Sequence, residues 1–117
     1  NIPDTAMIEE IVKTHRKFKK ISSGGAPDVR IIVFNKVPIM AMLRLPTEES
    51  GGKANLHQGA IGLGIDIATG ITTHGVYKGQ RIKYFPGTQK KVNGITVPEW
   101  NKVLRMAVET QIASDLG

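Results

Sequence analysis

Two apolar runs joined by a two-residue turn restrict the fold of this chain more than any other feature. The first run, Val29–Phe34, is rich in β-branched residues, and Asn35-Lys36 separates it from the second run, Val37–Leu45. Runs of this kind around two turn-forming residues predict a β-hairpin. Pro38 lies near the start of the second run, where a strand tolerates proline. We therefore expect an antiparallel sheet built around this hairpin.

A second hairpin is predicted further along the chain. The runs Ala60–Ala68 and Ile71–Tyr77 flank the turn-forming pair Thr69-Gly70. Residues 78–95 are basic and rich in turn-forming residues, and a short strand is expected there at Ile82–Phe85.

An amphipathic helix is predicted at each end of the chain. Residues from about Thr5 to Ile21 carry apolar side chains at spacings of three and four, and His15 lies on that stripe. At the other end, Thr96 is expected to be the N-cap of a helix, with Glu99 three residues later as its capping-box partner. The apolar stripe of this second helix is Trp100, Val103, Leu104, Ala107, Val108 and Ile112. The order of elements predicts an α+β fold, an antiparallel β-sheet with helices packed on one face.

Length and composition fit one globular domain over residues 1–117, with 40% hydrophobic and 22% charged residues. The chain has no cysteine, which excludes disulfides, thiolate metal sites and cysteine nucleophiles. No apolar run approaches the roughly 20 residues that span a bilayer. The first residues also lack the basic and apolar regions of a signal peptide. The sequence therefore predicts a cytoplasmic protein without a membrane partner.

Positive charge dominates the chain, which has a formal net charge of +6. Ten of the basic residues form two clusters: Lys13, Arg16, Lys17, Lys19 and Lys20, and then Lys78, Arg81, Lys83, Lys90 and Lys91. We interpret these clusters as solvated faces, with a basic nucleic-acid-binding module as an alternative. The three Phe, two Tyr and one Trp include no aromatic RNA-binding motif, so nucleic acid is disfavoured as a partner.

Motifs for catalysis are scarce. His15, His57 and His74 are widely separated and lack metal-ligand spacing, and we interpret His15 and His74 as packed core residues. The glycines of Gly59-Ala-Ile-Gly62-Leu-Gly64 have the wrong spacing for a dinucleotide fingerprint, and no helix follows them.

Two arginines interrupt the first hairpin and are the strongest candidates for a binding site. Arg30 and Arg44 lie in otherwise apolar strands that the hairpin brings side by side. A guanidinium there needs a partner or a ligand, and its planar fork of donors suits a phosphate or a carboxylate. The alternative is a structural pairing with Asp28 or another carboxylate. The stretch Ser50–Gly59 follows, with Lys53, Asn55 and His57 as further polar contacts and glycines that allow close backbone approach.

These residues together resemble a known family. The order of Asp28-Val-Arg30, then Arg44, then Lys53-Ala-Asn55-Leu-His57-Gln-Gly59 resembles the ATP-grasp ligases, and most closely the alpha-L-glutamate ligase-like proteins. Four stretches carry the closer likeness: Pro38-Ile-Met-Ala-Met-Leu-Arg-Leu-Pro-Thr47, Ala54-Asn-Leu-His-Gln-Gly59, Gly64-Ile-Asp-Ile-Ala-Thr-Gly70 and Val97-Pro-Glu-Trp100.

The resemblance implies a nucleotide-binding ligase that uses ATP and Mg²⁺ to join a carboxylate to an amine through an acyl phosphate. The expected partners are ATP, an amino acid such as glutamate, and a peptide or small-molecule acceptor. By resemblance, Arg30 and Arg44 would neutralise the phosphates, Asn55 would lie beside the terminal phosphate or the substrate, and Gly59 would allow close backbone approach. Lys53 is a further phosphate contact by its chemistry.

The chain also departs from the family's pattern. Ala60 stands where the glutamate ligases have a second glycine. The family's magnesium ligands, an acidic residue and a later Glu-x-Asn, would lie beyond Gly117, so we assign no metal ligand here. We therefore expect the chain to be a central piece of an ATP-grasp domain, inactive alone, with a mobile loop from Thr47 to Lys53.

Overall fold

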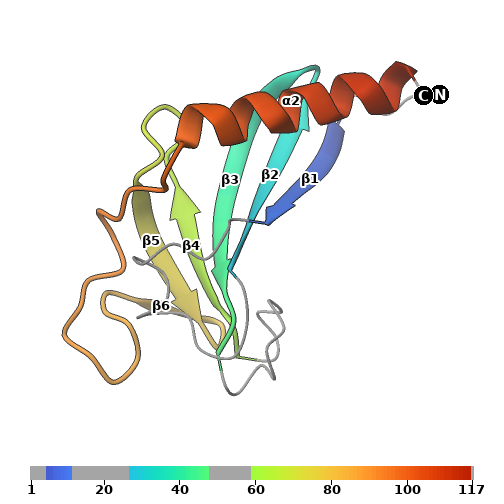
Figure 1. Ribbon diagram of the computed structural model, residues 1–117. Coiled ribbons are helices and arrows are strands. Elements are labelled where there is room, and N and C mark those ends of the chain that lie inside the picture. Colours follow the sequence, from blue (N-terminus) through green and yellow to red (C-terminus); the bar gives the residue numbers. More distant parts are fainter. Residues whose placement is uncertain (1–4, 12–26, 48–58, 117) are drawn as a thin grey trace.

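An antiparallel sheet with the strand order β1-β2-β3-β4-β5-β6 dominates the computed structural model, which describes residues 5–11, 27–47 and 59–116. Each strand pairs with the next in sequence, and one helix crosses β3, β2 and β1 at one end of the sheet (Figure 1). The elements are β1 (Thr5–Ile11), β2 (Asp28–Phe34), β3 (Val37–Leu45), β4 (Ile61–Ile65), β5 (Thr72–Tyr77), β6 (Gln80–Ile82) and α2 (Trp100–Leu116). This arrangement confirms the predicted α+β fold class.

The first hairpin is confirmed by the pairing of β2 with β3. Asn35 and Lys36 form its turn with φ angles of 48° and 65°, the left-handed pair that a two-residue turn of type I′ requires. That turn matches the twist of the two strands and places Phe34 opposite Val37. Between Ile32 and Val33 the register then shifts by one residue, a β-bulge that places Ile32 opposite Met40 and Asp28 opposite Arg44. An unbroken two-residue hairpin would pair Asp28 with Leu43, so the observed register departs from the one that the turn alone predicts.

The second hairpin is also confirmed, with β4 and β5 joined through residues 66–71. Gly70 has a φ of 74°, and an added Cβ there would lie 2.4 Å from Cγ of Trp100, so this position requires glycine. The short strand that was predicted at Ile82–Phe85 is observed at Gln80–Ile82, because a tight turn at Lys78 and Gly79 returns the chain to β5 at once.

The predicted N-terminal helix is wrong over Thr5–Ile11, which forms the edge strand β1. This segment pairs antiparallel with β2, from Thr5 opposite Phe34 to Ile11 opposite Asp28. The edge of β2 offers a row of backbone donors and acceptors, and a strand that pairs with them satisfies its own backbone groups. Only Ile8 and Ile11 of the predicted apolar stripe lie in this segment, so the preference for a helix is weak here and sheet pairing prevails. The rest of the predicted helix, with His15 and the basic cluster of residues 13–20, lies outside the described residues. So does most of the loop predicted from Thr47 to Lys53.

The C-terminal helix is confirmed, but its predicted N-cap is wrong. α2 begins at Trp100, and the carbonyl of Glu99 accepts the first helical bonds, from the amides of Lys102 and Val103 at 3.0 and 3.1 Å. Thr96 instead forms a bridge with Ile71, which holds it extended at the edge of the sheet. Pairing with the sheet thus moves the N-cap by three residues, from Thr96 to Glu99.

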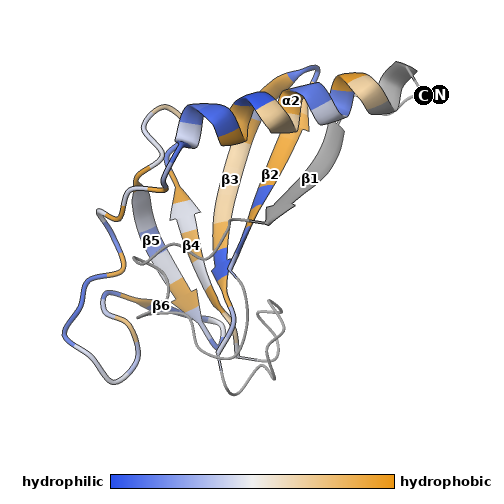
Figure 2. Ribbon diagram, viewed as in Figure 1, coloured by the Kyte–Doolittle hydropathy of each residue, from blue (hydrophilic) through white to orange (hydrophobic). Residues whose placement is uncertain are grey.

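The two faces of the sheet differ in burial. On one face, which we call the covered face, lie fully buried apolar side chains such as Val29, Ile31, Leu43 and Leu63. α2 packs over this face beside β1 to β3, and residues 83–97 cover it beside β5. Figure 2 shows the apolar colouring concentrated along β2 and β3 beneath the helix.

Two polar side chains fasten these coverings to the sheet. Gln111 of α2 is 2% exposed, accepts a hydrogen bond from the Lys36 amide at 2.7 Å and donates one to the Val33 carbonyl at 3.2 Å. Thr72 of β5, also 2% exposed, donates through its hydroxyl to the Val92 carbonyl at 2.8 Å. The same hydroxyl accepts from the Ile95 amide at 2.9 Å. Residues 92–95 are thereby held against the sheet.

Candidate functional site

The opposite face of the sheet, which we call the open face, carries the predicted arginines. Side chains alternate between faces along a strand, so Arg30 and Arg44 lie on the side away from Val29 and Leu43. Arg30 is opposite Met42, and Arg44 is opposite Asp28, which makes the two arginines diagonal neighbours. At such positions the spacing is about 7–8 Å, close enough for both side chains to serve one ligand.

Arg44 is held by a carboxylate. Its Nε donates to Oδ1 of Asp28 at 2.8 Å and its Nη2 donates to Oδ2 at 2.7 Å, a bidentate pair. The two side chains are 12% and 15% exposed, so solvent screens the pair only in part. The sequence left open a structural pairing of Arg44 with Asp28, and the structure contains it. This pairing fixes the plane of the Arg44 guanidinium.

The remaining predicted site residues are described only in part. Gly59 lies beside the first hairpin with a φ of 96°, and its carbonyl accepts a hydrogen bond from the Thr47 hydroxyl at 2.7 Å. This backbone conformation favours glycine, in line with the special role expected at this position. Lys53, Asn55 and His57 lie outside the described residues.

β4 presents two glycines to the open face next to the arginines. Gly62 is opposite Arg44 and Gly64 is opposite Met42. Between Leu63 and Ile65 the pairing of β4 with β5 shifts, because Thr73 and His74 together stand opposite Gly64. This β-bulge turns the His74 ring over Gly64, where an added Cβ would lie 2.5 Å from Cε1 of the ring.

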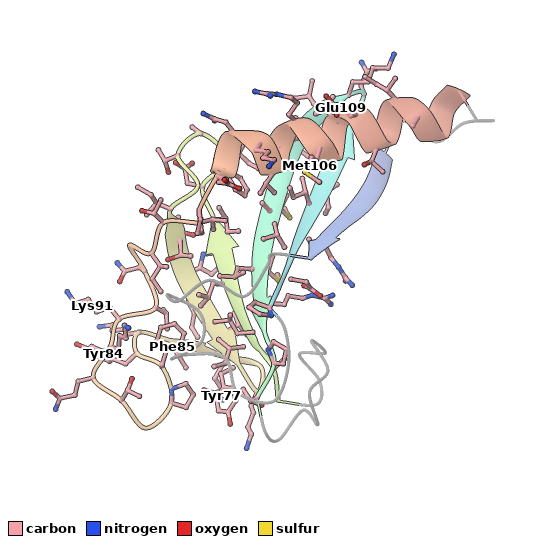
Figure 3. All side chains as sticks on the ribbon, in the orientation of Figure 1. Tyr77, Tyr84, Phe85, Lys91, Met106 and Glu109 are labelled. Atoms are coloured by element: carbon pink, nitrogen blue, oxygen red, sulfur yellow. The ribbon has the colours of Figure 1, made fainter. Side chains whose placement is uncertain are left out.

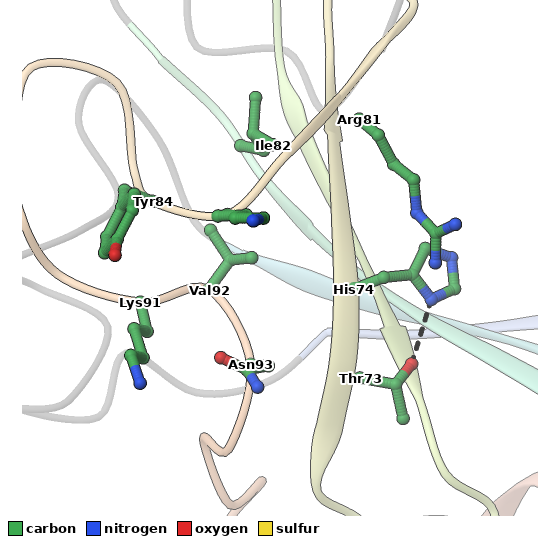
Figure 4. Close-up of a pocket in the computed structure, with 9 residues that line it drawn as sticks. Thr73, His74, Arg81, Ile82, Tyr84, Lys91, Val92 and Asn93 are labelled. Atoms are coloured by element: carbon green, nitrogen blue, oxygen red, sulfur yellow. Dashed lines mark hydrogen bonds between the residues drawn. The ribbon is translucent and has the colours of Figure 1, made fainter.

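His74 is consequently exposed, which corrects its interpretation as a core residue. Its Nδ1 lies 3.0 Å from the Thr73 hydroxyl, and both side chains line a cleft of about 610 Å³ at the β5–β6 end of the sheet (Figure 4). The cleft is also lined by Arg81, Lys83 and Lys91.

Sequence reasoning missed this cleft by interpreting the second basic cluster as a solvated face. A signal for it exists in the sequence, because residues 71–97 include five Lys or Arg and no Asp or Glu. Five cations without one acidic neighbour in the segment indicate an anion-binding surface more strongly than a mixed charged face does.

Neither a clustered metal site nor a membrane-spanning helix is found among the described residues. The described residues contain no group of three or more His, Asp or Glu that could hold a metal ion. Among these residues, no helix is long and apolar enough to cross a membrane.

An antiparallel α+β sheet with two arginines on its open face, together with the motifs described above, is consistent with an ATP-grasp protein. Comparison with protein families identifies the branch: the model of the sugar-transfer associated ATP-grasp family matches residues 1–117, so the chain belongs to that family. The match covers the whole chain and places it among ATP-dependent, nucleotide-binding, ligase-type proteins. No curated protein matches, and no solved structure does.

Proposed function

We propose that this protein joins a carboxylate to an amine by way of an acyl phosphate, the chemistry of the ATP-grasp ligases that it resembles. In the first step a carboxylate oxygen of the donor attacks the terminal phosphorus of ATP, the bond from that phosphorus to ADP breaks, and ADP leaves. In the second step the amine attacks the acyl carbon, the C–N bond forms, and the bond to phosphate breaks. The amine loses one proton and inorganic phosphate leaves.

One observation carries the proposal: the Asp28–Arg44 pair fixes a guanidinium on the open face diagonal to Arg30. Charge develops on phosphoryl oxygens in both steps, and donors that are already oriented stabilise it without reorganisation. In this role Asp28 is a positioning residue, while Arg44 and Arg30 contact the phosphates.

Three further residues complete the proposed site. Lys53 contacts a phosphate, Asn55 lies beside the terminal phosphate or the substrate, and the backbone at Gly59 approaches the ligand closely. Mg²⁺ would accompany the nucleotide, as it generally does in ATP-dependent ligases.

The substrates are proposed from two likenesses. Resemblance to the alpha-L-glutamate ligase-like proteins supports an amino acid such as glutamate as the carboxylate donor, with a peptide or a small molecule as the acceptor. The description of the family as sugar-transfer associated favours a small-molecule acceptor that carries a sugar with a free amine. We propose the cytoplasm, where ATP is plentiful, as the site of this reaction.

The experiment is chemical capture of the acyl phosphate. The intact protein is incubated with ATP, Mg²⁺ and a panel of amino acids in hydroxylamine, which attacks an acyl phosphate to give a stable hydroxamate. We expect hydroxamate and ADP to form in equal amounts with one or a few donors, and only when ATP is present. Release of phosphate without hydroxamate from every donor would refute the acyl-phosphate step.

A further inference from the structure

The cleft at the β5–β6 end of the sheet lies apart from the paired arginines. Arg44, the nearer of the two arginines, is on β3, and Arg81 is on β6, three strand spacings away in the cross-strand row that runs through Gly62 and Val76. At ~4.8 Å per spacing the two positions are about 14 Å apart, so no single phosphoryl group contacts both. A ligand in the cleft is therefore a different group from the one that Arg30 and Arg44 hold.

The lysine and arginine side chains that line the cleft have no acidic counterpart in its lining. Arg81, Lys83 and Lys91 line it, no acidic side chain does, and none of the three makes an ion pair within the part of the chain that the structure describes. Side chains enter from both sides of β5: Figure 4 shows Thr73, His74 and Arg81 on one side and Tyr84, Lys91 and Asn93 on the other. Three basic side chains and no acidic one around the cleft favour an anionic ligand.

The backbone holds these groups in place before any ligand arrives. The bulge at Thr73 and His74 turns the imidazole over Gly64, the one residue type that leaves room for the ring. Thr72 fixes the opposite wall, because its hydroxyl bonds the backbone at both Val92 and Ile95. A preformed cleft avoids the entropic cost of ordering its walls on binding.

The cleft also offers an aromatic surface and room for more than an anion. Tyr84 is 46% exposed and points outward, whereas the adjacent Phe85 is 4% exposed and points to the core (Figure 3). The volume of about 610 Å³ lies within the range of small-molecule sites. An aromatic ring next to clustered cations suits a ligand with a ring of its own and a phosphoryl group.

We propose that this cleft binds the phosphoryl group of a phosphorylated sugar, the acceptor substrate of the ligase. That the ligand is a substrate of the ligase rests on the proposed function. The chemical class of the ligand is argued from the cleft itself. Arg81 and Lys91 contact the phosphoryl oxygens, and Tyr84 packs against the sugar. The amine of an amino-sugar phosphate bound in this way can extend along the open face toward the arginines.

The test is calorimetric titration of the protein with glucosamine 6-phosphate, without ATP or Mg²⁺, next to glucosamine and inorganic phosphate. We expect glucosamine 6-phosphate to bind, inorganic phosphate to bind more weakly and glucosamine not to bind. Arg81→Gln and Lys91→Gln should each weaken the binding of glucosamine 6-phosphate about tenfold, the effect of losing one charge-assisted hydrogen bond. Arg81→Lys should recover part of that loss.

Lys90→Gln is the matched control, because Lys90 is an exposed neighbour that does not line the cleft. It should change the affinity less than twofold, and the melting temperature of every variant should match that of the wild type. Equal weakening by Lys90→Gln would reveal a nonspecific charge effect and overturn the proposal. So would unchanged binding in both Arg81→Gln and Lys91→Gln, or no binding of either phosphate-containing probe.

Two competitors distinguish other anions. If ATP or a single-stranded oligonucleotide displaces glucosamine 6-phosphate and binds more tightly, with the same dependence on Arg81 and Lys91, the cleft is a nucleotide or nucleic-acid site and the proposal fails. The outcome is separable from the proposed function. Sugar-phosphate binding without hydroxamate formation would refute the ligase chemistry alone, and hydroxamate formation without sugar-phosphate binding would refute the cleft alone.

Discussion

Replacement of Arg44 separates its structural role from its proposed catalytic role only if Asp28 is replaced as well. In Arg44→Met the carboxylate of Asp28 stays 15% exposed, or somewhat more, and loses both hydrogen bonds of the bidentate pair. Removing one partner of a buried pair costs about 3–5 kcal/mol. Because this pair is partly exposed, we expect Arg44→Met to lower the free energy of unfolding by about 2–4 kcal/mol.

The double variant Asp28→Leu/Arg44→Met strands no charge. Asp28 and Arg44 are direct cross-strand partners, and two apolar side chains there can pack on each other, so the double variant should lie within about 1 kcal/mol of the wild type. The rate of hydroxamate formation should not recover together with the stability of the double variant. If Arg44 stabilises charge on the phosphates, both variants should form hydroxamate at least about 100-fold more slowly than the wild type.

The assay combines urea unfolding with hydroxamate formation on the same four proteins: the wild type, Asp28→Leu, Arg44→Met and the double variant. Stability that returns in the double variant while hydroxamate formation stays low would confirm a catalytic role for Arg44. Recovery of both quantities together would refute it and leave the arginine as a partner of Asp28 alone.

Three stability predictions follow from the fold. Thr72→Val should lower the free energy of unfolding by about 2–4 kcal/mol in urea unfolding, because two backbone groups lose their hydroxyl partner; Thr72→Ser should retain most of the stability, and equal loss in both would refute the hydrogen-bond explanation. Gly70→Ala should cost about 2–5 kcal/mol, through its φ of 74° and the contact of the new Cβ with Trp100; an unchanged melting temperature would contradict this. Lys36→Gly should raise stability by about 0.5–1 kcal/mol, since its φ of 65° favours glycine, while Gly79→Ala at a φ of 75° should lower it; shifts of the same sign would refute the turn argument.

Local sequence signals predicted the parts of the fold that local chemistry determines. The two hairpins follow from β-branched runs and short turns, and α2 follows from its apolar stripe. β1 could not be predicted in this way, because the pairing of Thr5–Ile11 with β2 joins segments that are distant in sequence. Gln111 was missed because a polar residue within an apolar stripe gives no sign that it caps the turn at Lys36.

Part of the candidate site could likewise be predicted from the sequence, and part could not. Arg30 and Arg44 stood out because a charge within an apolar strand requires an explanation. The β-bulge between Ile32 and Val33, which no local pattern predicted, then places them on one face of the sheet. The cleft around His74 depends on a bulge and on the hydroxyl of Thr72, which bring together residues that no spacing rule connects. The family came from motifs and not from geometry, since a shared fold alone does not specify a reaction.

The covered face also determines where the arginines lie. Val29 is opposite Leu43 and Ile31 is opposite Ala41, and all four are buried beneath the coverings of the sheet. A slip of β3 by one residue would turn Leu43 to the open face and drive Arg44 into the core, where a guanidinium without its carboxylate is strongly disfavoured. The apolar row therefore specifies the register that pairs Arg44 with Asp28. Substitutions in this row that keep its volume should preserve the orientation of the arginines, whereas those that loosen it should disturb the site without touching a single polar residue.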